Sequence, residues 1–123
     1  LTLCTGSLGA GSANDPVSIA TTHSPQIHFA HLRNVRKEPD GSFEEAAHLA
    51  GDINMTAICR VLTGEEARRR AEGREDHAIP FRPDHGHELL SDREKQAFPG
   101  YPLVGRLRGL AELRGVLHAL AET

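Results

Sequence analysis

Three side chains of the metal-ligand type lie at or near the ends of the apolar segments that we expect to form strands. Cys4 ends the first segment, His31 lies near the end of the second, and Asp84 follows the third. A thiolate, an imidazole and a carboxylate together suit a divalent transition metal such as Fe²⁺, Mn²⁺, Co²⁺ or Zn²⁺. The alternative is structural, with Cys4 as a small buried apolar residue, His31 as a hydrogen-bonded core histidine and Asp84 as a cap or turn residue.

The densest group of reactive side chains is the stretch Arg82-Pro83-Asp84-His85-Gly86-His87, directly after the third segment. It combines a cation, a carboxylate and two imidazoles, which a plain turn does not require. His85, beside Asp84, has the chemistry of a general acid or base. Arg82 and Arg33 have the geometry to hold the carboxylate of an acidic substrate through paired hydrogen bonds. For both arginines, the alternative is an ordinary surface or loop-tying role.

The only tyrosine, Tyr101, lies in the rigid turn Pro99-Gly100-Tyr101-Pro102. Its phenol can donate or relay a proton when a cation or metal lies nearby, whereas a tyrosine without such neighbours is more often a packing residue. His48 is a further candidate for contact with the substrate at the same opening. Asp52 is another, and for Asp52 a helix-capping role is at least as good an interpretation.

Three extended segments are expected to position these side chains. Residues 1–4 have the pattern of the end of a buried strand, residues 27–33 alternate with period two, and the prolines of residues 78–83 keep that segment extended. The glycine-rich residues 5–12 are expected to form a loop after the first strand. Residues 43–49 are expected to form either a helical turn or an ordered loop.

Helices are expected between and after these strands. Asn14-Asp15-Pro16 is a helix-start signature for a short segment that ends near Thr22. Asp52 is placed to cap a second helix with apolar residues at intervals of three and four. The leucines of residues 103–121 recur at the same intervals, which predicts a third helix that packs on an apolar surface.

Strand and helix therefore alternate three times, which predicts an α/β fold of parallel strands joined by right-handed crossovers. A (β/α)₈ barrel uses roughly 30 residues in each unit, so a chain of 123 residues corresponds to about three of the eight units. We therefore predict that residues 1–123 are part of a single TIM-barrel domain. In such barrels the functional groups collect at the carboxyl ends of the strands.

Composition excludes several classes of function. The formal net charge is −3 and aromatic residues make up 4% of the chain, so a basic, base-stacking surface for nucleic acid is not expected. No apolar run approaches the roughly 20 residues that span a bilayer, and no export signal is visible. The two cysteines do not form a disulfide framework, so a reducing compartment, the cytoplasm, is expected.

Several motifs, in one order along the whole chain, resemble the C-terminal part of the mannonate dehydratase family. These motifs are Leu1-Thr2-Leu3-Cys4-Thr5-Gly6-Ser7-Leu8-Gly9, Phe29-Ala30-His31-Leu32-Arg33, Glu45-Ala46-Ala47-His48-Leu49 with Gly51-Asp52, Arg82-Pro83-Asp84-His85-Gly86, Pro99-Gly100-Tyr101, and Gly105-Arg106-Leu107-Arg108-Gly109-Leu110-Ala111-Glu112. Several separate motifs in one order are far more specific than any one of them.

The resemblance implies a xylose-isomerase-like TIM barrel that dehydrates D-mannonate to 2-dehydro-3-deoxy-D-gluconate in hexuronate (glucuronate) breakdown. It implies Fe²⁺ or Mn²⁺, held in the family by a cysteine, two histidines and an aspartate. Cys4, His31 and Asp84 match three of these ligands, and the other histidine is expected before Leu1. His85 and Tyr101 match the residues associated with proton transfer, without an indication of which is the acid and which the base.

The same resemblance predicts that the N-terminal part of the barrel is absent and that this chain alone is inactive. We also expect the complete enzyme to be a homo-oligomer. Two alternatives remain at this point. The chain is either an inactive remnant that binds metal or partner subunits, or part of a related metal-dependent dehydratase or isomerase that acts on another sugar acid.

Overall fold

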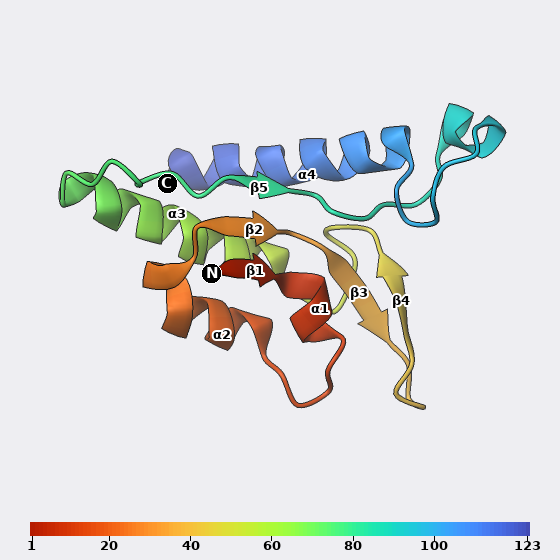
Figure 1. The fold of residues 1–123 in the computed structure, drawn as a ribbon, viewed down its shortest axis with the longest axis horizontal. Coiled ribbons are helices and arrows are strands. Elements are labelled where there is room, and N and C mark those ends of the chain that lie inside the picture. Colours follow the sequence, from red (N-terminus) through yellow and green to blue (C-terminus); the bar gives the residue numbers. More distant parts are fainter.

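The computed structural model describes residues 1–123, and its centre is a three-stranded parallel sheet (Figure 1). The strands are β1 (Thr2–Cys4), β2 (Phe29–His31) and β5 (Phe81–Arg82), in the spatial order β1-β2-β5. Cys4 pairs with His31, and His31 pairs with Arg82. This register places the carboxyl ends of all three strands at one edge of the sheet. The parallel α/β arrangement expected from the sequence is confirmed.

Helices flank this sheet, as Figure 1 shows. They are α1 (Thr5–Gly9), α2 (Pro16–His23), α3 (Met55–Ala71) and α4 (Leu103–Ala121), with short 3₁₀ turns η1 (Ser24–Gln26) and η2 (Leu90–Glu94). Asp15 caps α2 by accepting a hydrogen bond from the Val17 amide, and Pro16 is the first helical residue, as the sequence predicted. None of the helices has both the length and the apolar character needed to cross a membrane.

The expected loop after β1 is instead the short helix α1. Its first residue, Thr5, is buried, and the Thr5 hydroxyl donates to the carbonyl oxygens of His31 and Arg33. Gly6 lies so close to the Arg33 side chain that a Cβ atom there would clash with it. The small residues that suggested a loop therefore allow close packing of α1 against the chain that leaves β2.

The segment after β2 forms an antiparallel hairpin of β3 (Asn34–Lys37) and β4 (Phe43–Ala46). The expectation of a helical turn or loop at residues 43–46 was therefore wrong. The turn between the strands has Gly41 at φ +89°, and the Asp40 carboxylate accepts hydrogen bonds from the backbone and hydroxyl of Ser42. Exposed charged residues occupy both strands, which hid the alternation expected of a strand.

Asn54, not Asp52, caps α3. The Asn54 side chain accepts a hydrogen bond from the Ala57 amide. Asp52 is exposed, and its carboxylate accepts a hydrogen bond from the Lys37 amide at 2.8 Å. This hydrogen bond joins the segment before α3 to strand β3 of the hairpin. The buried Asn34 side chain donates to the carbonyl oxygens of His48 and Ile53, so it holds the same segment from the inside.

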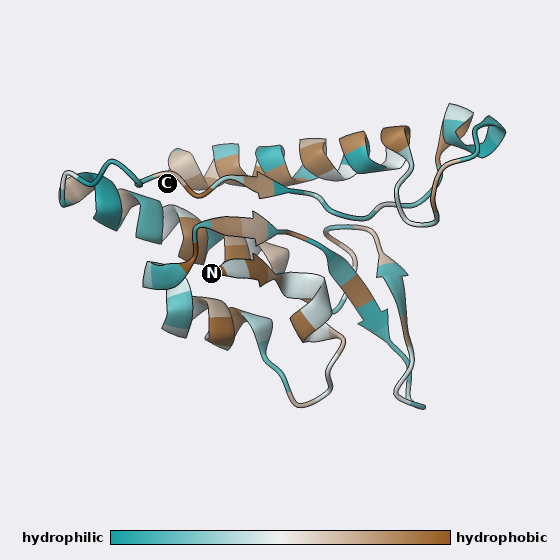
Figure 2. Ribbon diagram, viewed as in Figure 1, coloured by the Kyte–Doolittle hydropathy of each residue, from teal (hydrophilic) through white to brown (hydrophobic).

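The leucine stripe of α4 is only partly buried. Leu113 is fully buried in the apolar core, but Leu103 and Leu107 are 59% and 54% exposed. Apolar residues run along the whole helix (Figure 2). The predicted packing of α4 on an apolar surface is confirmed at Leu113, Leu117 and Leu120. In its first two turns α4 instead buries Gly105 and Gly109.

Arg69 on α3 is a fully buried cation that joins this helix to the chain entering β2. It donates to Glu65 at 2.7 Å and to the Ile27 carbonyl oxygen at 2.7 Å. Glu65 is also held by Arg68, and these hydrogen bonds lower the pKa of Glu65 to about 2 despite the opposing effect of burial. A buried charge of this kind is held by several partners at once.

Replacing Arg69 by methionine is expected to lower the free energy of unfolding by about 3 kcal/mol or more, because Glu65 and the backbone carbonyls lose a buried partner. Urea unfolding followed by circular dichroism measures this. The matched control is Arg70→Met, which breaks only an exposed pair with Glu66 and should cost less than about 1 kcal/mol. Equal losses in the two variants would contradict the structural role of Arg69.

Candidate metal and proton-transfer site

The three predicted metal ligands lie together at the carboxyl edge of the sheet. One ligand atom each from Cys4, His31 and Asp84 can be chosen so that all three lie within 4.8 Å of one another. The paired register of β1 and β2 sets Cys4 beside His31, and the chain leaving β5 brings Asp84 to them. Ser7, on α1, donates its hydroxyl to the Cys4 sulfur at 3.1 Å.

Asp84 is a buried carboxylate with one oxygen atom that lacks a hydrogen bond. It is only 3% exposed, and its Oδ1 atom accepts no hydrogen bond. The Arg82 Nη2 atom lies 2.8 Å from Oδ1, close enough for charge attraction although the pair lacks hydrogen-bond alignment. A buried, unsatisfied carboxylate oxygen next to a thiol and an imidazole fits a bound cation. The donor set suits Fe²⁺ or Mn²⁺ as well as Co²⁺ or Zn²⁺.

Arg82 lies at this cluster and remains accessible. Its Nη2 atom is 3.5 Å from His31 Nδ1, its Nε atom has no partner, and the side chain is 43% exposed. The exposed part of this guanidinium, beside the three ligand-type residues, suits recognition of a carboxylate.

Arg33 lies near the same edge, but its guanidinium already has a carboxylate partner. Its Nε atom donates to both carboxylate oxygens of Glu45, at 2.9 and 3.1 Å, and its Nη2 atom also contacts Glu45. The hydrogen bond to Glu45 raises the pKa of Arg33. The guanidinium also lies 5.7 Å from the centre of the Phe43 ring. The contacts of Arg33 in this structure are therefore those of a residue that ties the hairpin to β2.

His85 and Tyr101 lie side by side although 15 residues separate them in the sequence. Their ring centres are 4.6 Å apart, and the His85 Nδ1 atom is 3.1 Å from Asp84 Oδ2. Gly100, at φ +82°, makes this approach possible because a Cβ atom there would clash with the His85 ring. Since a carboxylate only accepts, the His85 Nδ1 atom is the donor, and in the neutral imidazole Nε2 then carries the lone pair.

Two further contacts, made by Arg106 and Asp92, were not predicted from the sequence. The Arg106 guanidinium lies 5.5 Å from the centre of the Tyr101 ring. Asp92 accepts hydrogen bonds from the amides of Val104 and Gly105, and so caps α4 from a distant loop. Burial opposes ionisation of Asp92, but these backbone donors lower its pKa overall. No local motif signals either contact, because each depends on how the loop folds onto α4.

His48 lies behind the site and is only 3% exposed. Its Nε2 atom donates to the carbonyl oxygen of Pro83 at 2.6 Å, and its ring packs against Gly109 of α4. The prediction that His48 contacts substrate is not tested by these contacts, but the partner that it has is the backbone next to Asp84.

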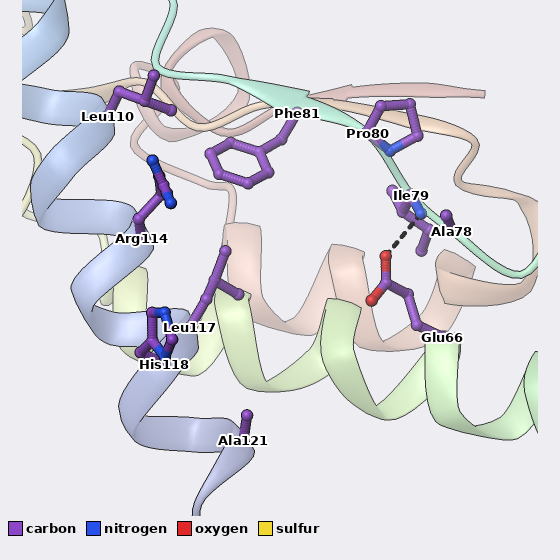
Figure 3. A pocket seen from close by; sticks show the side chains of 10 residues that line it. All are labelled: Glu66, Ala78, Ile79, Pro80, Phe81, Leu110, Arg114, Leu117, His118 and Ala121. Atoms are coloured by element: carbon purple, nitrogen blue, oxygen red, sulfur yellow. Dashed lines mark hydrogen bonds between the residues drawn. The ribbon is translucent and has the colours of Figure 1, made fainter.

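The largest hollow lies elsewhere, along β5 (Figure 3). This open groove of about 680 Å³ is bordered by α3, α4 and the chain entering β5, and its walls are mainly apolar, with Phe81, Leu110 and Leu117 among the lining residues. Glu66, on its far side, accepts a hydrogen bond from the Ile79 amide. None of the predicted site residues lines this groove.

Comparison with known proteins gives the site a context. The family model described as D-mannonate dehydratase (UxuA) matches residues 1–123. The chain belongs to the mannonate dehydratase family. It is 56% identical over 124 residues to mannonate dehydratase 1 of Agrobacterium fabrum and 55% identical to the mannonate dehydratase of Rhizobium meliloti. The mannonate dehydratase of Saccharophagus degradans is 54% identical over 122 residues.

These mannonate dehydratases are much longer than the present chain. The matches cover 98% of the chain but only 30–31% of each relative. The site described above therefore comes from a segment that corresponds to under a third of a family member.

Proposed function

We propose that this chain supplies the metal-binding and proton-transfer part of a mannonate dehydratase, a lyase that converts D-mannonate to 2-dehydro-3-deoxy-D-gluconate and water. The reaction belongs to hexuronate breakdown in carbohydrate metabolism, and the proposed cofactor is Fe²⁺ or Mn²⁺. The observation that carries the proposal is the meeting of Cys4, His31 and Asp84 beside the His85–Tyr101 pair. Family membership favours this sugar acid over other substrates.

Elimination of water from a 2,3-dihydroxy acid needs a base and an acid. The C2–H bond breaks and its electron pair forms the C2=C3 bond, while the C3 hydroxyl leaves with an added proton as water. The resulting enol then rearranges to the 2-keto acid. A divalent metal, when bound, would supply stabilisation of negative charge on the substrate's carboxylate or adjacent hydroxyl.

The geometry favours His85 as the base and Tyr101 as the acid. Because Asp84 accepts the Nδ1 proton of His85, the Nε2 lone pair is available to take the C2 proton. Tyr101 carries a phenolic proton, is 39% exposed and lies against the same imidazole, so its hydroxyl is placed to protonate the leaving group. Two groups in contact can then serve adjacent carbons of one substrate.

Arg82 is the proposed partner of the substrate carboxylate, since its side chain is 43% exposed and its guanidinium lies beside the three ligands. Substrate contact is also proposed for Arg33, but its Nε and Nη2 atoms are already occupied by the Glu45 carboxylate in this structure. His48 is also part of the proposed site, since it contacts the backbone next to Asp84.

We further propose that the parallel sheet is the C-terminal portion of a xylose-isomerase-like (β/α)₈ barrel, with a second histidine ligand supplied by the preceding part. Both outer strands, β1 and β5, have only one strand neighbour here, which is consistent with further strands in a longer protein. A cytoplasmic location and a homo-oligomeric complete enzyme belong to the same proposal.

The test is formation of the 2-keto-3-deoxy acid from D-mannonate with Mn²⁺ under reducing conditions. The 123-residue chain is compared with a full-length polypeptide that contains it, and other sugar acids serve as control substrates. Product from the full-length protein alone, with D-mannonate preferred, supports the proposal. Preference for another sugar acid would favour a related dehydratase or isomerase, and tight metal binding without any turnover would favour an inactive remnant.

A further inference from the structure

We propose that His48 is a positioning residue that fixes Asp84 for metal binding by holding the peptide bond that joins Pro83 to Asp84. This inference rests on the proposed metal site and assigns to His48 a role other than contact with substrate. Three observations carry it: the backbone conformation of Asp84, the hydrogen bond from His48 to Pro83, and the glycine of α4 that accommodates the His48 ring.

Asp84 has an uncommon backbone conformation. Its φ is +66°, in the left-handed region that residues other than glycine, asparagine and aspartate seldom adopt. Such a conformation persists only where the surrounding structure enforces it. This conformation turns the Asp84 side chain back toward Cys4 and His31, so whatever holds the backbone also holds the ligand.

His48 is placed to provide that restraint. Its Nε2 atom lies 2.6 Å from the Pro83 carbonyl oxygen, and both residues are buried. A carbonyl oxygen only accepts, so His48 carries its proton on Nε2. The Pro83 carbonyl and the Asp84 amide belong to one planar peptide group. A hydrogen bond to the oxygen therefore restrains the orientation of the whole peptide group and, with it, the backbone of Asp84.

The His48 ring is itself held from two sides. The buried Asn34 side chain donates to the His48 carbonyl oxygen at 2.9 Å, which anchors the backbone of His48 to β3. On the other side the ring lies against Gly109, where a Cβ atom would clash with its Cε1 and Nδ1 atoms. His48 therefore joins the hairpin, α4 and the chain after β5 next to Asp84, the residue with the positive φ.

The test measures Mn²⁺ affinity of the full-length protein by electron paramagnetic resonance of the free ion. The matched pair of variants is His48→Gln and His48→Asn. The glutamine amide nitrogen reaches the position of Nε2, whereas the shorter asparagine stops near the position of Nδ1. We expect the asparagine variant to bind Mn²⁺ about 10-fold to 100-fold more weakly, the range seen when a group that orients a metal ligand is lost. The glutamine variant should retain affinity within a few-fold.

A substitution on α4 tests the same role of His48 independently. Gly109→Ala displaces the His48 ring without altering His48 and should weaken Mn²⁺ binding like His48→Asn. Gly115→Ala is the control on the same helix, because a Cβ atom there meets nothing within 4 Å. Thermal unfolding of each variant reports separately on the fold.

The outcomes distinguish a failure of the positioning role of His48 from a failure of the proposed metal site. If the unchanged protein binds no Mn²⁺, the metal site of the proposed function fails and the role of His48 fails with it. If the unchanged protein binds Mn²⁺ and His48→Asn binds it equally well, only the positioning role is overturned. Equal weakening by the asparagine and glutamine variants would also overturn it, since the Nε2 donor would then be irrelevant.

Discussion

Asp84→Asn in the full-length protein is expected to lose at least about 100-fold in Mn²⁺ affinity, with dehydratase activity falling in parallel. Loss of a group that merely orients a ligand costs about 10-fold to 100-fold, so loss of a charged ligand should cost more. Asparagine keeps the shape of Asp84 but removes the negative charge from a carboxylate that lies with Cys4 and His31 and has one unsatisfied oxygen. Titration with Mn²⁺ and assay of the keto acid measure the two effects.

The control for this change is Asp15→Asn, which removes one exposed carboxylate that is not part of the site. Asp15 caps α2, and asparagine is an equally good cap, so both affinity and fold should persist. An Asp84→Asn variant that binds Mn²⁺ as tightly as the unchanged protein would remove Asp84 from the ligand set.

His85→Asn is expected to reduce turnover by about 10²-fold to 10⁴-fold, the usual contribution of a general acid or base, while Mn²⁺ stays bound. The asparagine amide can still donate to Asp84, as the Nδ1 atom of His85 does, so the carboxylate keeps this partner. What the variant lacks is Nε2, the atom proposed to take the C2 proton. Steady-state turnover and Mn²⁺ affinity, measured on the same protein, separate the two functions.

His118→Asn provides the comparison for His85, because His118 is exposed on α4 and lies along the apolar groove of Figure 3. It should leave turnover unchanged. Unchanged turnover in His85→Asn would exclude His85 from the mechanism, and a parallel loss of Mn²⁺ would show that its role is to support Asp84 instead of moving a proton.

Much of the fold could be predicted because its local signals agree with its packing. The cap and proline at Asp15 and Pro16, and the regular leucine spacing after Pro102, correspond to α2 and α4 in the structure. The hairpin could not be predicted in the same way, since its strands expose charged side chains such as Arg36 and Glu44 that pair across it. Its stability comes from backbone pairing and from contacts with the segment before α3, which no short window of sequence contains.

Some contacts of the candidate site could likewise be predicted from the sequence, and others could not. Cys4, His31 and Asp84 could be predicted to meet because parallel strands end at one edge of a sheet, and the structure brings them together. The partner of Arg33 could not be predicted, because Glu45 reaches it only through the hairpin. Likewise, the burial of His48 follows from its fit against Gly109, a contact between segments about 60 residues apart.

The proposed binding of a metal by the Cys4 thiolate, together with His31 and Asp84, can be tested with Co²⁺. A cobalt–thiolate bond produces a charge-transfer absorption, so anaerobic titration of the reduced full-length protein with Co²⁺ should generate that band. The Cys4→Ser variant should lack the band, whereas Cys59→Ser should retain it, because Cys59 is buried in α3 and burial raises the pKa of its thiol to about 11. A band of equal strength in Cys4→Ser, or no band in the unchanged protein, would contradict the account.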